Sequence, residues 1–197
     1  MKTIEINELL NIIDYEKVRN TYRSDIISYK TNRRVLLGNQ ISMVFENRKT
    51  MKFQIQEMMR AERMVHDEAI QHEIDVYNSL LPAENELSAT LFIEITEEEK
   101  IREDLHKFLG LTDGKSLWIE FGSNQVFAEF EAGRSEEDRI SSVHYIRFPF
   151  TPAQIEEFQN VQVPAYMKIS QKTYQHSLLL GNEIRTSLIS DLLEKNK

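Results

Sequence analysis

The chain has 197 residues, of which 41% are hydrophobic and 28% charged, and it contains no cysteine. The missing thiols exclude disulfides, thiolate nucleophiles, structural zinc ribbons and cysteine-ligated iron–sulfur clusters. The acidic balance, with a formal net charge of −8, argues against broad binding of nucleic acid, which needs Lys and Arg to neutralise phosphates, and against acidic membranes.

This length is enough to bury a substantial core, and the composition is that of an ordinary globular protein. We therefore expect one α+β domain over residues 1–197, mainly helical over 1–82 and richer in sheet over 83–197. The opening MKTIEINELLNIID interrupts its apolar residues with Glu and Asn, so it does not resemble a secretory signal. No window approaches a transmembrane span, and we expect a cytoplasmic protein.

The first predicted element is a helix that Asp14 caps. Its buried stripe repeats every three or four residues and consists of Tyr15, Val18, Tyr22, Ile26 and Tyr29. The strand-like RRVLLG follows, a turn is predicted at Gly38-Asn39, and the next strand covers 41–47.

A long central helix is predicted from Thr50, its expected N-cap, to Pro82. Its apolar face comprises Met51, Ile55, Met58, Val65, Ala69, Val76 and Leu80. On the opposite face, Glu57 precedes Arg60 by three residues, a spacing typical of a solvated pair. The polarity rises over 65–68, and if the helix breaks there, the shared face is lost.

The second half begins with alternating residues over 87–95, which predict a strand. Thr96 with the following glutamates predicts a capped helix that continues to Leu109 and ends at Gly110. The runs SLWIEF, QVFAEFEA and ISSVHYIRFPF suggest an antiparallel meander. Thr151-Pro152 opens a short helix, two further strands follow, and an amphipathic helix begins at Gly181-Asn182. The whole predicts an α+β fold in which a helical N-terminal half, with the long central helix, packs on a mainly antiparallel sheet and a helix ends the chain.

The central helix carries three ionisable residues on its apolar face, Glu62, His66 and Glu73, within about 40° of one another. Glu62 and His66, four residues apart, could both bind one divalent metal ion. Glu73 lies about 10.5 Å further along the axis, too far to bind the same ion without a second metal or a bend. The alternative is that Glu62 and Glu73 form buried ion pairs with Arg33 or Arg34.

A cluster of basic residues precedes and begins the central helix. It is a candidate anion site, to which the helix N-terminus would add its own attraction, and it includes Arg33, Arg34, Arg48 and Lys49. A solvated face is the simpler interpretation. His144 alternates with Tyr145 and shares a strand face with Ile146 and Phe148, which is typical of a core histidine.

In the segments RRVLLG, FEN, QIQEMMRAER, ELSATLFIEI and VHYIRF, the chain resembles a bacterial family known only as a domain of unknown function, over nearly its whole length. The resemblance implies a genomic context of rubrerythrin-like proteins and iron–sulfur oxidoreductases. It therefore implies an interaction or accessory protein of a redox or oxidative-stress system, with such proteins as partners. The alternative is a metal-dependent enzyme or small-ligand-binding protein that uses Glu62, His66 and Glu73.

Overall fold

The computed structural model describes residues 1–95, 97, 99, 101–133, 139–172 and 174–194. In chain order these residues form the elements η1 (Ile6–Glu8), α1 (Ile12–Thr31), β1 (Arg34–Leu37), β2 (Ile41–Glu46), α2 (Arg48–Ala61), α3 (Asp67–Ser79), β3 (Glu86–Ile93), α4 (Ile101–His106), β4 (Leu117–Phe121), β5 (Asn124–Phe127), β6 (Glu129–Phe130), β7 (Val143–Pro149), α5 (Pro152–Gln159), β8 (Ala165–Gln171), β9 (Tyr174–Leu179) and α6 (Asn182–Leu193). The α+β prediction is confirmed, including the C-terminal helix. None of the helices formed by the described residues is both long and apolar enough to cross a bilayer.

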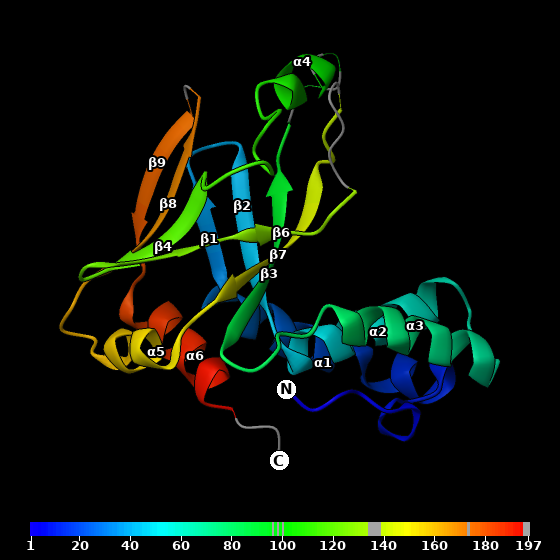
Figure 1. The fold of residues 1–197 in the computed structure, drawn as a ribbon. Coiled ribbons are helices and arrows are strands. Elements are labelled where there is room, and N and C mark those ends of the chain that lie inside the picture. The colour runs from blue at the N-terminus through cyan, green and yellow to red at the C-terminus, as the bar shows by residue number, and fades with distance from the viewer. Residues whose placement is uncertain (96, 98, 100, 134–138, 173, 195–197) are drawn as a thin grey trace.

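The strands form two antiparallel sheets rather than one. The five-stranded sheet has the order β1-β2-β3-β7-β6, and the four-stranded sheet has the order β5-β4-β8-β9. Figure 1 shows α1, α2 and α3 gathered into a helical arm on one side of the sheets, with α5 and α6 near their lower end and α4 at the other end. Strands β1 and β2 come from the N-terminal part of the chain, so the sheets are not built from the second half alone.

The main core lies between the two sheets and is filled by the residues that alternate inward along each strand. Phe45 of β2 and Phe148 of β7 meet there with ring centroids 5.9 Å apart. The run QVFAEFEA passes from one sheet to the other at Ala128, where the amide of Ala128 still donates to the carbonyl of Leu117. The predicted meander is therefore divided between the two sheets.

The prediction of one continuous central helix is wrong. The segment forms a hairpin of α2 and α3, with Arg63 in the left-handed region at φ 52° and the amide of Met64 bonded to the carbonyl of Met59. The hairpin buries Met59 and Ile74 in one small core, whereas Val65 of the connection is 69% exposed. A straight helix would have left the apolar face of its second half in water.

Helix caps differ in detail from those predicted. Asn11, not Asp14, caps α1, and the side chain of Asn47 caps α2 while Thr50 completes a capping box at the third helical position. The capping box of Thr151 with Gln154 in α5 is confirmed. Helix α4 ends at His106, earlier than expected, and Thr96 lies outside the described residues.

Candidate functional site

The three predicted metal ligands do not share a face. Glu62 is the C-cap of α2, His66 is the N-cap of α3, and Glu73 lies within α3. Glu62 and His66 are exposed, so Glu62 is not in a buried ion pair. The described part of the chain contains no group of three or more His, Asp or Glu residues that could hold a metal ion. Metal binding by these residues stays a prediction, open to elemental analysis, but it has lost its geometric basis.

The predicted anion cluster is dispersed because its members bind other parts of the protein. Arg33 is fully buried and pairs with Asp191, and Arg48 pairs with Glu8. The ammonium of Lys49 lies 4.2 Å from the centroid of the Tyr29 ring, and Arg34 is exposed on β1. These contacts leave no shared site for a phosphate, and anion binding by the four residues stays an unsupported prediction.

A different site is created by the register of the five-stranded sheet. Glu46 of β2 lies opposite Ser88 of β3, Ser88 lies opposite Arg147 of β7, and Arg147 lies opposite Glu129 of β6. Two residues along, Thr90 lies opposite Tyr145. Since side chains two apart on a strand share a face, these residues form two adjacent polar rows on the sheet face opposite the main core.

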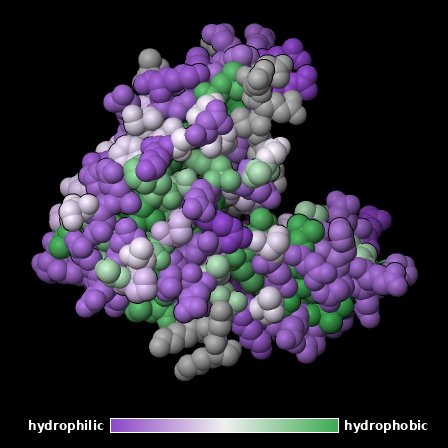
Figure 2. Space-filling view, in the orientation of Figure 1, coloured by the Kyte–Doolittle hydropathy of each residue, from purple (hydrophilic) through white to green (hydrophobic). Residues whose placement is uncertain are grey.

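The polar rows line a pocket of about 400 Å³ where the sheet meets the helical arm, which we call the sheet pocket. Figure 2 shows the surface hollowed between the sheets and the arm. The pocket is lined by Glu46, Met51, Ser79, Leu80, Ser88, Ala89, Thr90, Glu129, Phe130, Glu131, Tyr145, Ile146 and Arg147. A volume of this order is typical of sites for small molecules.

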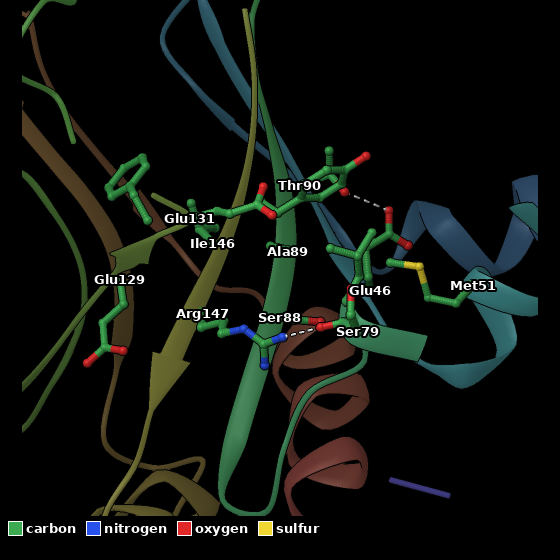
Figure 3. A pocket seen from close by; sticks show the side chains of 13 residues that line it. Glu46, Met51, Ser79, Ser88, Ala89, Thr90, Glu129, Glu131, Ile146 and Arg147 are labelled. Carbon is green, nitrogen blue, oxygen red and sulfur yellow. Dashed lines mark hydrogen bonds between the residues drawn. The ribbon is translucent and has the colours of Figure 1, made fainter. Parts of the chain in front are cut away.

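Glu46 is the most unusual lining residue because its carboxylate is buried, with the residue only 3% exposed. One carboxylate oxygen, Oε1, accepts a hydrogen bond from the hydroxyl of Thr90 at 3.2 Å, as Figure 3 shows. The other oxygen, Oε2, has no hydrogen-bond partner among the described residues. The nearest cation is the ammonium of Lys30, 3.9 Å from Oε2, which is beyond hydrogen-bond distance.

Ser88 adds a second buried polar atom without a partner. The residue is 5% exposed, and no described residue forms a hydrogen bond with its hydroxyl. Because Ser88 is directly opposite Glu46 in the sheet, the two unpartnered atoms belong to neighbouring positions of one polar row. Buried polar groups are nearly always hydrogen-bonded, so two unpartnered atoms in one pocket make the sheet pocket the candidate site.

The remaining polar groups of the pocket are held in place by the surrounding structure. Arg147 donates to the carbonyls of Ser79 (2.5 Å, Figure 3) and Leu81 (3.3 Å) and pairs with Glu86. Next to the pocket, burial raises the pKa of Tyr77 in α3 to about 12, with smaller contributions from Glu73, Tyr145 and Glu46. The phenol of Tyr77 therefore stays protonated at neutral pH.

Sequence reasoning missed the sheet pocket although its signal is present. Polar residues two apart occur in several strands, as in Ser88 with Thr90 and Tyr145 with Arg147. In one strand this pattern indicates only a solvent-facing side. The sheet order is needed to see that the patterns are adjacent, and the helical arm covers them, which no periodicity shows.

One comparison with known proteins identifies a family. The profile described as "Protein of unknown function (DUF3501)" matches residues 3–192. A crystal structure of a "novel protein of unknown function" from Burkholderia pseudomallei K96243 is similar to this fold, with a TM-score of 0.88 and 27% sequence identity over 97% of this chain and 100% of that chain. No curated protein matches. The segments that form the sheet pocket all lie within the matched residues, and the chain belongs to the DUF3501 family of proteins of unknown function.

Proposed function

We propose that the protein binds a small polar molecule in the sheet pocket. The observation that carries this proposal is the presence of two buried, unpartnered polar atoms, Glu46 Oε2 and Ser88 Oγ, in one pocket of about 400 Å³. Burying such groups without partners costs about 1–3 kcal/mol each by mutational data. A ligand that donates to the carboxylate and to the hydroxyl would offset that cost.

The construction of the pocket also supports a binding role. Its polar side chains project from hydrogen-bonded strands, whose register fixes their spacing before any ligand arrives. Met51 and Leu80 supply apolar walls beside them. Apolar walls with a few fixed polar groups are the usual composition of ligand sites.

A blocking substitution tests the proposal. Ser88→Leu should fill the pocket, whereas Ser177→Leu adds the same side chain to the exposed surface of β9. A ligand-detected NMR screen of neutral, cationic and anionic small compounds should find molecules that bind the wild type and Ser177→Leu but not Ser88→Leu. A screen without binders, or binders that are retained by a folded Ser88→Leu protein, would refute a ligand site here.

An accessory role in a cytoplasmic redox system, as the family resemblance implies, is a second proposal. One observation favours a protein contact: Ile13 and Val65 are 74% and 69% exposed, and they line the same shallow hollow at the end of the helical arm. Exposed apolar residues that gather in one place are typical of interaction surfaces.

The second proposal has its own test. A purified rubrerythrin-like protein or iron–sulfur oxidoreductase from the same organism should bind the wild type, and Val65→Glu should weaken that binding. Glu68→Gln, an exposed change in the first turn of α3, serves as the control. If both variants bind the partner protein as well as the wild type does, the contact is not at Val65. If the wild type binds neither protein, the named partners are refuted.

A further inference from the structure

We infer that the ligand of the sheet pocket is a small organic ammonium compound, a primary amine that is protonated at neutral pH. This inference rests on the proposed binding function and adds the chemical class of the ligand. It follows from the charges of the lining residues, from the unpartnered carboxylate oxygen and from the lack of a metal-ligating group among the residues that the structure describes.

The lining residues carry an excess of negative charge. Glu46 and Glu129 are acidic, and Arg147 is the one cation among the described lining side chains. Arg147 is already paired with Glu86, which does not line the pocket, and the ammonium of Lys30 stays 3.9 Å from Glu46 Oε2, so neither cation forms a hydrogen bond with the carboxylate of Glu46. A pocket whose walls focus one sign of charge attracts a ligand of the opposite sign.

The orientation of Glu46 locates the expected position of the ligand charge. Thr90 occupies Oε1, and Oε2 has no donor among the described residues, so one strong acceptor position is open. An ammonium group has three N–H donors, and a charge-assisted hydrogen bond to a carboxylate is about twice as strong as a neutral one. The same group could also donate to Ser88 Oγ, the neighbour of Glu46 across the sheet.

The remainder of the pocket selects an organic cation over a metal ion. Within the described residues no three His, Asp or Glu side chains are grouped to hold a metal. The walls provide aliphatic contacts from Met51 and Leu80 and the aromatic ring of Tyr145. Aromatic faces attract ammonium groups, and the aliphatic walls accommodate a short hydrocarbon chain.

Three probes with the same carbon chain separate the charge of the ligand from its size. We would titrate n-butylammonium, 1-butanol and butanoate at equal ionic strength and follow the backbone amide signals of Ser88, Thr90 and Tyr145 by NMR. Only n-butylammonium should shift these signals saturably. Glu46→Gln should weaken its binding by at least about tenfold, since a charge-assisted bond is lost, and Glu156→Gln on the exposed side of α5 should not.

The outcomes that overturn the inference differ from those that overturn the binding function. Saturable binding of butanoate or butanol as tight as that of n-butylammonium, or n-butylammonium binding that a folded Glu46→Gln protein retains, would refute the ammonium class while the pocket still binds. No binding by any probe would also refute it, and the broader screen with Ser88→Leu then decides on the pocket itself. Ser88→Ala, which keeps the charge, should weaken n-butylammonium binding less than Glu46→Gln does.

Discussion

Arg33 and Asp191 are 158 positions apart in the chain and form a buried ion pair that joins the residue before β1 to the last helix, α6. The guanidinium also donates to the carbonyl of Phe45 and to the hydroxyl of Ser187, each at 2.8 Å. The second oxygen of Asp191 accepts from the side chain of Asn47 at 2.9 Å. The pair is therefore fully hydrogen-bonded, in contrast to the open carboxylate of Glu46.

Asp191→Asn should lower the free energy of unfolding by about 3–5 kcal/mol because it leaves the guanidinium of Arg33 buried without its counter-charge. Urea unfolding measures the loss. Asp25→Asn, on the exposed side of α1, should change stability by less than about 0.5 kcal/mol. Equal stability of Asp191→Asn and the wild type would show that the pair is not desolvated.

Glu57 is not on a solvated face, contrary to the expectation from its spacing to Arg60. Arg19 binds it with two hydrogen bonds of 2.8 Å, and the hydroxyl of Tyr15 adds a third at 2.7 Å. Glu57→Gln should therefore destabilise the protein by about 1–2 kcal/mol in urea unfolding, a value reduced by partial exposure to solvent. Glu68→Gln, which is exposed on α3, should have almost no effect.

The same contacts make part of the stability pH-dependent. Hydrogen bonding to Arg19 lowers the pKa of Glu57 below its ordinary value of 4.5, despite the opposing effect of burial. An acid with a lowered folded pKa stabilises the fold above its unfolded pKa, and this stabilisation is lost as the pH falls through the folded pKa. In thermal melts recorded from neutral pH downwards, the melting temperature of Glu57→Gln should decrease less with falling pH than that of the wild type. Parallel curves would contradict the pairing.

Local patterns in the sequence predicted the elements that depend on neighbouring residues. The alternation over 87–95 corresponds to β3, and the Thr151 capping box begins α5, because both signals depend on residues within a few positions. His144 is fully buried, as its place beside Ile146 and Phe148 predicted. The periodicity of the sequence predicts these features because the pleat of a strand and the pitch of a helix are local properties of the backbone.

The features that failed depend on distant partners. Arg33 is in a buried ion pair, as one alternative predicted, but its partner is Asp191, near the other end of the chain, and not Glu62 or Glu73. The central helix looked continuous because the left-handed turn at Arg63 carries no glycine to mark it. The sheet pocket requires four strands from both halves of the chain in one order, and that order is a long-range property of packing.

The hairpin of α2 and α3 predicts which methionine matters. Met59 is 3% exposed in the small core of the arm, whereas Met58, which a continuous helix would have buried, is only partly buried. Met59→Ala should cost about 2–5 kcal/mol in urea unfolding. Val65→Ala, in the exposed connection, should cost less than about 0.5 kcal/mol. A larger loss for Val65→Ala than for Met59→Ala would support the continuous helix instead.

Glu46 and Asp191 are both buried carboxylates, and changing each to its amide should have different effects on stability. Glu46→Gln removes a buried charge whose Oε2 has no hydrogen-bond partner among the described residues, so the substitution relieves an uncompensated desolvation cost. We expect the free energy of unfolding to fall by less than about 1 kcal/mol or to rise, as is common where a binding site is retained at the expense of stability.

Urea unfolding of Glu46→Gln beside Asp191→Asn makes the comparison within one protein. Lys30→Gln tests the alternative partner, because its ammonium lies 3.9 Å from Glu46 and is partly exposed, so its removal should cost much less stability than Asp191→Asn. If Glu46→Gln lost as much stability as Asp191→Asn, Glu46 would be a structural ion pair with Lys30. The open carboxylate would then no longer support a ligand in the sheet pocket, and the small loss that we expect is therefore a direct test of the site.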